Sequence, residues 1–276
     1  MRKLLVLFSL LWGCVVGSGG AGAAAPRNLC EAADDVAGVI TSLPRVATAL
    51  KPGAEFNVLA VGSATLFGPE ASLMPVTTTD QAVSVGQPGS APPSQMITGE
   101  PSERAFPRQM AKALQVAVPG VDVRLTVRGG RGLTAAEMLS LIRSSLAERS
   151  YQLVIWQTGT VEAVRNTPPG EFAQLLSEGA EVVQQAQADL VLIDPQFSRF
   201  LQTNSNLEPY EQAFQQLASM PGVLLFRRFD LMRAWANDGQ IDLERTAKSD
   251  RKRVVEVLHA CLGSHLARMV LAGARS

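Results

Sequence analysis

The chain has 276 residues, of which 46% are hydrophobic and 18% are charged, and its 25 basic residues balance its 25 acidic residues. A chain of this length and hydrophobic content can bury an ordinary core, which excludes intrinsic disorder and collagen-like repeats. Because no excess of positive charge attracts phosphates or anionic lipid, we expect no nucleic-acid partner.

The first 23 residues have the pattern of a secretory signal peptide. A basic tip at residues 1–3 precedes an apolar run at 4–12, and the small residues at 21–23 offer a cleavage site. We therefore expect export to the periplasm or beyond, with no membrane span left after the signal is removed. The run Leu-Trp-Gly-Cys that ends at Cys14 leaves lipidation open.

Removal of the signal leaves two cysteines, Cys30 and Cys261, near the two ends of the mature chain. In an oxidising compartment two remaining cysteines favour a disulfide bond, and the alternative is two buried thiols. In the chain-entropy model a bridge between these positions stabilises the fold by roughly 5 kcal/mol.

From residue 56 onward, short apolar runs alternate with longer amphipathic stretches, which is typical of strand and helix repeats on a parallel sheet. Strands are predicted at about 56–62, 121–128, 151–158, 189–194 and 222–227. Helices are predicted between them, at about 169–186, 207–219 and 252–272 and after a capping box formed by Thr134 and Glu137. We expect a signal peptide at 1–23, an N-terminal segment at 24–55 and one α/β domain at 56–276.

Residues 69–103 interrupt this rhythm, because they are rich in Pro, Ser, Thr and Gly and have no helical period. Unstructured segments of this length inside a compact domain are uncommon. Two interpretations remain open for this insertion: a cap over the preceding turn, or a solvated excursion.

That preceding turn has the sequence Gly-Ser-Ala-Thr-Leu-Phe-Gly at residues 62–68 and follows the first apolar strand. Open α/β sheets place reactive groups at the carboxyl ends of their strands. The segment resembles the first block of the SGNH/GDSL hydrolase superfamily, Gly-Asp-Ser-x-x-x-Gly, and especially a branch that has Gly-Ser-Ser-x-Thr-x-Gly. With both glycines matched, the position of the nucleophilic serine falls on Ala64, whose methyl group cannot attack an ester.

Further blocks of the same superfamily follow in order between about residues 43 and 272. The glycine that donates its backbone N–H to the oxyanion matches Gly129, and the oxyanion asparagine matches Val161. Counted back from His-Ala-Cys-Leu at 259–262, the acid and the base of the last block match Asp250 and Arg253. A tight strand-to-helix turn explains Gly129 equally well.

The resemblance implies a three-layer α/β/α sandwich with a five-stranded parallel sheet in flavodoxin-like order, and an ester hydrolase site that has lost three groups. Loss of one oxyanion donor, here at Val161, typically removes about 3 to 4 kcal/mol of transition-state stabilisation. A guanidinium such as that of Arg253 stays protonated and cannot accept the proton of a nucleophile. Residues 194–196 and 226–235 also match this branch, and we interpret them as architectural.

Other residues could serve the site in different ways. Ser63 is the alternative nucleophile, although neighbouring side chains at a strand end point to opposite faces. Asp250 and Arg253 could form a structural ion pair, or Arg253 and Arg131 could bind a carboxylate or acidic sugar together with the N–H of Gly129. The two histidines lack a cluster of Cys or carboxylate partners, so we expect no metal and no cofactor.

These residues favour an exported, non-catalytic SGNH-hydrolase-like protein that binds a carbohydrate or acyl ligand, or an envelope protein partner, through the inherited cleft. One alternative is an active ester hydrolase, acting on carbohydrate or lipid esters with a shifted set of catalytic residues. Another is a structural protein of the cell envelope. The joint loss of nucleophile, oxyanion asparagine and base favours the first.

Overall fold

The computed structural model describes residues 30–31, 36–73 and 94–276 of the chain. The predicted signal peptide at 1–23, Cys14 and residues 74–93 of the insertion lie outside the described residues.

The core of the described chain is a twisted sheet in the strand order β2-β3-β1-β4-β5-β6. Strands β3, β1, β4, β5 and β6 are parallel, and their order is that of flavodoxin-like proteins. The predicted fold class is therefore confirmed, and the sheet has one strand more than expected. The strands are β1 (Glu55–Ser63), β2 (Gln95–Met96), β3 (Asp122–Arg131), β4 (Leu153–Gln157), β5 (Asp189–Ile193) and β6 (Val223–Phe226).

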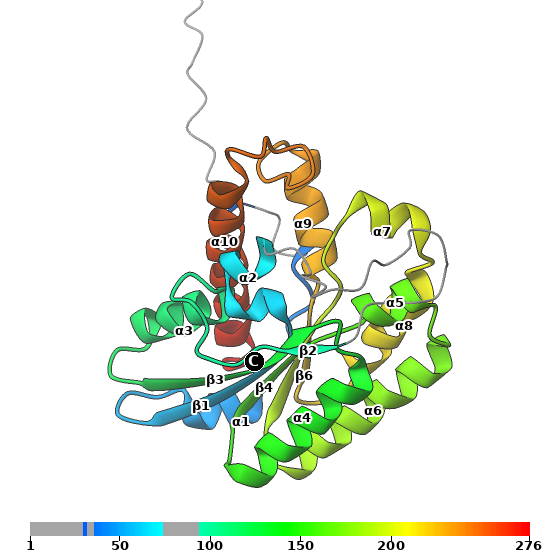
Figure 1. Cartoon of the computed structure of the whole chain (residues 1–276). Coiled ribbons are helices and arrows are strands. Elements are labelled where there is room, and N and C mark those ends of the chain that lie inside the picture. The colour runs from blue at the N-terminus through cyan, green and yellow to red at the C-terminus, as the bar shows by residue number, and fades with distance from the viewer. Residues whose placement is uncertain (1–29, 32–35, 74–93) are drawn as a thin grey trace, which may run out of the picture.

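Helices cover both faces of the sheet, which makes three layers (Figure 1). One face carries α4 (Ala135–Glu148), α6 (Pro169–Gln185) and α8 (Glu208–Leu217). The other carries α1 (Pro44–Ala49), α3 (Phe106–Ala117) and α10 (Arg251–Gly273). Shorter connecting helices are η2 (Ala64–Phe67), α2 (Pro69–Leu73), α5 (Thr160–Arg165), α7 (Arg199–Asn204) and α9 (Arg228–Asn237).

Strands β4 and β5 are buried along their whole length, because helices lie on both sides of them. This explains why their sequences are continuous apolar runs rather than alternating ones. The predicted capping box is also present, since the Thr134 side chain accepts from the Glu137 N–H and the Glu137 carboxylate accepts from the Thr134 N–H.

The extra strand β2 pairs antiparallel with the end of β3 because two glycines leave room on both sides. A Cβ at Gly130 would lie 1.9 Å from the carbonyl oxygen of Gln95 in β2, and one at Gly129 would lie 1.9 Å from that of Gly62 in β1. Strand β3 therefore continues to Arg131. A tight strand-to-helix turn at Gly129, one of the two sequence-based explanations, is not what the structure contains.

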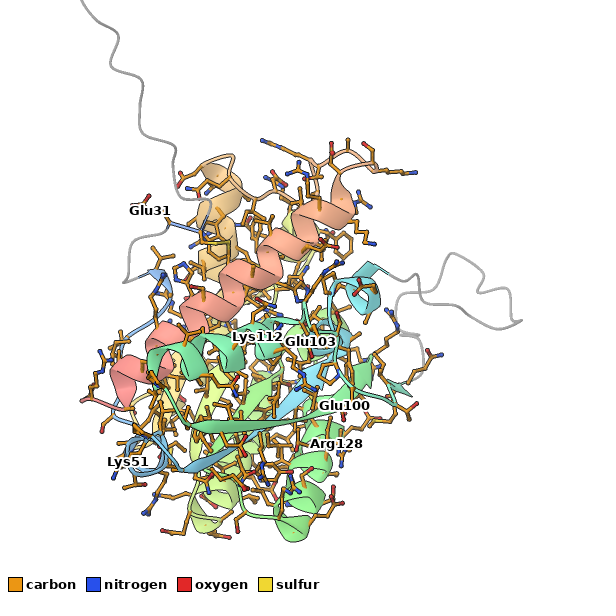
Figure 2. All side chains as sticks on the ribbon, turned by 90° about the vertical axis from the view of Figure 1, so that its left-hand side faces the viewer. Glu31, Lys51, Glu100, Glu103, Lys112 and Arg128 are labelled. Carbon is orange, nitrogen blue, oxygen red and sulfur yellow. A yellow bond between two sulfur atoms is a disulfide. The ribbon has the colours of Figure 1, made fainter. Side chains whose placement is uncertain are left out.

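The last residues of the insertion run beside α3 and form ion pairs with side chains of that helix. Figure 2 shows Glu103 and Lys112 close together there, and the carboxylate of Glu103 lies 2.8 Å from the Lys112 ammonium. Glu100 pairs in the same way with Arg108, at 2.8 Å. These pairs are largely exposed, so each contributes about 1 kcal/mol or less.

The predicted disulfide is present between Cys30 and Cys261, whose Cα atoms lie 5.0 Å apart. It ties the N-terminal segment to α10, a helix that is long and apolar enough to cross a membrane by length and composition. Of the apolar stretch of α10, 61% is buried inside the protein, and the helix packs against α3. This burial is typical of the core helix of an α/β domain.

Candidate functional site

The turn after β1 contains a closed ring of three polar side chains. The Gln157 amide donates to Ser63 Oγ over 2.6 Å, and Thr65 Oγ1 donates to Gln157 Oε1 over 3.0 Å. Ser63 Oγ and Thr65 Oγ1 are 3.0 Å apart. Because the Thr65 hydroxyl already donates its proton to Gln157, the Ser63 hydroxyl donates to Thr65 and closes the ring.

This ring determines what the two candidate nucleophile positions can do. Ala64 is 7% exposed at the start of η2 and carries no reactive atom. The hydroxyl proton of Ser63 goes to Thr65, and neither histidine forms a hydrogen bond with Ser63 within the described chain. The sequence-based alternative nucleophile is therefore present at the site but has no base beside it.

The two oxyanion positions lie on either side of β1, one in β3 and the other in the helix that follows β4. Gly129 pairs with Gly62 in the parallel ladder, and Val161 is the second residue of α5, after β4. The residue after Val161, Glu162, is 3% exposed and accepts from the Ala135 N–H at 2.6 Å and from the Gly159 N–H at 3.2 Å. Burial raises the pKa of Glu162, and its backbone hydrogen bonds oppose this shift. Glu162 thus joins the amino ends of two helices.

A cavity of about 330 Å³ opens beside this turn, at the carboxyl ends of the parallel strands. Loops and helices that are distant in sequence line it, and part of its wall is apolar. Below it is called the Arg228 cavity. Its polar lining consists mainly of Thr65, Ser72, Gln196, Arg228, Arg251 and His259.

His259 contributes a buried imidazole to the Arg228 cavity. Its Nδ1 accepts from the backbone N–H of Phe106 over 3.1 Å, and its Nε2 lies 3.4 Å from Ser72 Oγ. Burial, aided by the positive charge of Arg228, lowers the pKa of His259 to about 4. The imidazole is therefore neutral at pH 7, and because Nδ1 is the acceptor its proton is on Nε2.

This tautomer decides the chemistry of the Ser72 and His259 pair. In a catalytic triad the histidine Nε2 must accept the proton of the nucleophile, while Nδ1–H donates to an acid. Here Nε2 is the donor and Ser72 Oγ donates to the carbonyl of Gly68 over 2.9 Å. The pair has the distance of a nucleophile and its base but the opposite proton arrangement. His259 instead satisfies the free N–H at the start of α3.

The rotation of α10 decides which of its residues reach the Arg228 cavity. Arg251, Val255 and His259 line it and are spaced four residues apart, so they share one face of the helix. Arg253 is two residues from Arg251, on another face, and its side chain is 71% exposed. Arg253 and Asp250 lie 4.0 Å apart, which is the ion pair considered from the sequence.

Arg131 is held by the protein itself, because its guanidinium donates to the carbonyl of Ala71 in α2 over 2.6 Å. Neither Arg131 nor Arg253 lines the Arg228 cavity. Their assignment as ligand-binding residues stays a prediction. The sequence match placed the base position of the last block at Arg253, and the structure places a different residue of the same run, Arg251, at the cavity.

Sequence reasoning missed Gln157, Arg228 and Arg251 as site residues. Gln157 ends a buried strand, and a glutamine at such a position is a usable signal because a buried amide needs partners. Arg228 had no signal, since it belongs to the run Arg-Arg-Phe-Asp that we interpreted as architectural. Within the described ranges no three His, Cys, Asp or Glu side chains gather in a way that could hold a metal ion.

The sequence model of the non-GDSL lipase-like family matches residues 29–276. No curated protein matches the chain. Among solved structures, a two-domain esterase (CEX) active on acetylated mannans superposes with a TM-score of 0.56 at 12% identity, over 86% of this chain and 54% of the esterase chain. This chain thus spans about half of that esterase.

A second similar structure is Axe2, an acetylxylan esterase from Geobacillus stearothermophilus. It superposes with a TM-score of 0.54 at 14% identity, over 80% of this chain and 96% of Axe2. At these identities the likeness to both esterases concerns the fold, which agrees with the strand order and the three layers described above.

Proposed function

The chain belongs to the non-GDSL lipase-like family and has an SGNH-hydrolase-like fold, and from this premise we propose that it is an exported, non-catalytic member. It binds a small ligand in the Arg228 cavity, at the strand ends where this fold places its functional site. The similar structures are esterases of acetylated polysaccharides, which makes carbohydrate or acyl groups the first ligands to consider.

The observation that carries this proposal is the hydrogen bonding of the two serines near the site. Ser63 donates to Thr65, and Ser72 donates to Gly68. The imidazole nitrogen beside Ser72 Oγ is His259 Nε2, which bears a proton and cannot serve as a base. A serine without an acceptor for its proton is not activated as a nucleophile.

An active esterase remains the second candidate because Ser72 and His259 lie so close together. If the imidazole of His259 rotated so that Nδ1 no longer accepted from the Phe106 N–H, the proton would be able to move to Nδ1. Nε2 would then accept the proton of Ser72. Hydrolysis of p-nitrophenyl acetate and butyrate by the purified chain separates the two proposals. We expect no release of p-nitrophenol above that of a heat-denatured sample. Release that disappears in Ser72→Ala or Ser63→Ala would establish the esterase instead.

Export is tested on the chain itself. Expressed from residue 1 in a bacterial host, the protein is expected in the periplasmic or secreted fraction, with a mature N-terminus near residue 24. A matched version that lacks residues 1–23 is expected to stay in the cytoplasm. Retention of both versions inside the cell would contradict this part of the proposal.

A further inference from the structure

Arg228 is a buried cation whose guanidinium lacks a hydrogen-bond partner in the described chain. The whole residue is 2% exposed, and its guanidinium forms no hydrogen bond or ion pair with any residue that the structure describes. Its Nε is buried and unsatisfied. Removing a guanidinium from water without replacing its hydrogen bonds is strongly unfavourable, so such a group favours an acceptor from elsewhere.

Asp194, the buried carboxylate that interacts electrostatically with Arg228, does not supply this hydrogen bond. Asp194, at the end of β5, accepts instead from the Phe229 N–H over 2.9 Å. Burial raises the pKa of Asp194 to about 7, so its negative charge is incomplete at neutral pH. Burial also lowers the pKa of Arg228, to about 10, which still leaves it protonated at pH 7. The neighbouring His259 is neutral.

A second guanidinium lies on the wall of the same cavity. Arg251 lines the Arg228 cavity, and its Nε is also buried without a hydrogen-bond partner in the described chain. The one carboxylate of the lining, Glu244, is already engaged, because it accepts from the backbone N–H and the guanidinium of Arg199. The wall therefore has unbalanced positive charge.

A helix end adds to this positive charge. Arg228 is the first residue of α9, and Arg251 is the first residue of α10. The amino end of a helix carries a partial positive charge, which disfavours a cation and favours an anion. No acidic residue lies in the first turn of α10, and its N-cap residue Asp250 forms no side-chain capping bond. At α9 the Phe229 N–H is already bonded to Asp194 and Asp230 lies in the first turn, so of the two helices it is α10 whose amino end adds positive charge to that of the two guanidinium groups.

Another part of the lining is apolar and includes Phe106, Leu258 and Leu262. A cavity of about 330 Å³ is within the usual size range of small-molecule sites. A ligand that fits must therefore combine an anionic group with an apolar body. The planar fork of a guanidinium matches a carboxylate through two parallel hydrogen bonds.

We propose that the Arg228 cavity binds a small carboxylic acid with an apolar chain or ring, whose carboxylate pairs with Arg228 and Arg251. This inference rests on the proposed function, because it names the ligand class of the same cavity. The apolar body lies against Phe106, Leu258 and Leu262, and Gln196 supplies a further polar contact.

Titration calorimetry of the full chain with octanoate and with octanamide tests the charge requirement. The two probes have nearly the same shape, and only octanoate carries a charge. We expect octanoate to bind about tenfold more tightly than octanamide, or better. Equal affinities, or no octanoate binding at millimolar concentration, would overturn the inference.

The variant Arg228→Met tests the residue, because methionine fills similar space without charge. We expect about a tenfold or greater loss of octanoate affinity and an unchanged affinity for octanamide. The matched control is Arg245→Met, which removes the same charge from a side chain that is 77% exposed and does not line the cavity, and which should change octanoate affinity by less than about twofold. An Arg228→Met protein that binds octanoate as the unmodified chain does would contradict the proposal.

If Arg228→Met does not fold, as judged by circular dichroism, Arg251→Met decides in its place. A loss of octanoate affinity supports the inference, and unchanged affinity overturns it. Binding of inorganic phosphate in place of octanoate would overturn the carboxylate assignment. Absence of octanoate binding in a protein that hydrolyses no ester refutes this inference alone, whereas ester hydrolysis refutes the proposed function.

Discussion

The polar ring after β1 and the wall of the Arg228 cavity lie at the same end of the sheet, and they differ in how well their polar groups are satisfied. In the ring, the side chains of Ser63, Thr65 and Gln157 bond to one another. On the cavity wall, the Nε atoms of Arg228 and Arg251 have no partner in the described chain.

The ring is a satisfied structural network, whereas the cavity wall has buried polar atoms that lack a hydrogen-bond partner in the described chain. A buried polar group in a native structure is normally hydrogen-bonded, so a closed network such as the ring needs nothing further. Two unpartnered guanidinium groups at one cavity are an exception that calls for an explanation. The satisfied polar groups therefore lie next to Ala64, and the unsatisfied ones lie on the cavity wall.

The largest effect is expected at the close contact between β1 and β3, next to the ring. In Gly129→Ala the new Cβ would lie 1.9 Å from the carbonyl oxygen of Gly62, at a backbone φ of +153°. Overpacking and backbone strain together should lower the free energy of unfolding by roughly 4 kcal/mol. Urea unfolding measures this. Gly170→Ala, which meets no atom within 4 Å, is the matched control and should leave stability the same or slightly higher.

The next effect concerns the carboxyl group nearest to Arg228. Burial raises the pKa of Asp194 from 3.8 to about 7, against the opposing effects of the Phe229 N–H and of Arg228. Between these two values the folded protein keeps a proton that the unfolded chain has lost. The contribution of Asp194 to stability is therefore complete below about pH 4 and is lost as the pH rises through about 7.

In Asp194→Asn this loss should disappear. Relative to the unmodified chain, the free energy of unfolding of the variant should increase by roughly 3 kcal/mol between pH 4 and pH 8. Urea unfolding at several pH values measures the difference. Parallel pH curves for the two proteins would show that Asp194 is ionised across this range.

A smaller loss is expected from opening the ring itself. Gln157→Leu removes the amide that donates to Ser63 and accepts from Thr65, and leaves two hydroxyl groups with one partner fewer. Stability should fall by about 2 kcal/mol, while octanoate affinity stays unchanged, since Gln157 does not line the Arg228 cavity. Gln185→Leu, at an exposed site of α6, should change stability by less than about 0.5 kcal/mol. Equal stabilities of the two variants would show that the ring is not structural.

The smallest expected effect is on the stability of Arg228→Met. It tests the comparison most directly, because it is expected to be zero or stabilising, whereas Gly129→Ala and Gln157→Leu are expected to be destabilising. Without ligand, Arg228→Met removes a buried charge that has no hydrogen-bond partner in the described chain, so stability should be unchanged or rise by about 1 kcal/mol. Arg131→Met removes a hydrogen bond to the carbonyl of Ala71 and should lower stability by about 1 kcal/mol. Thermal unfolding compares them, and a marked loss of stability in Arg228→Met would mean that Arg228 has a partner in the free protein.

Most of the fold could be predicted because its signals are local. The apolar runs near residues 56, 121, 151, 189 and 222 each became a parallel strand, and the Thr134 capping box begins a helix. Strand β2 was missed because two exposed residues carry no periodic pattern. Its pairing depends on the room left by Gly129 and Gly130, which is visible only when β1, β2 and β3 are placed together.

The site was predicted less well, and α10 shows the reason. Counting back from residues 259–262 matched the base of the last block to Arg253, but the face that α10 turns toward the cavity begins at Arg251. A difference of two residues rotates a side chain by about 200° around a helix. Register along a sequence does not give this rotation, because packing of α10 against α3 and the sheet sets it.

The sequence by itself determined the order of strands and helices, the disulfide partners and the absence of a hydroxyl at Ala64, because these follow from residue types and their spacing. Only the tertiary structure decided which polar groups are satisfied. The tautomer of His259 depends on the N–H of Phe106, 153 positions away. Arg228 lacks a hydrogen bond to Asp194 because that carboxylate accepts from the Phe229 N–H. Such partners come from separate elements, and only the folded chain brings them within reach of one another.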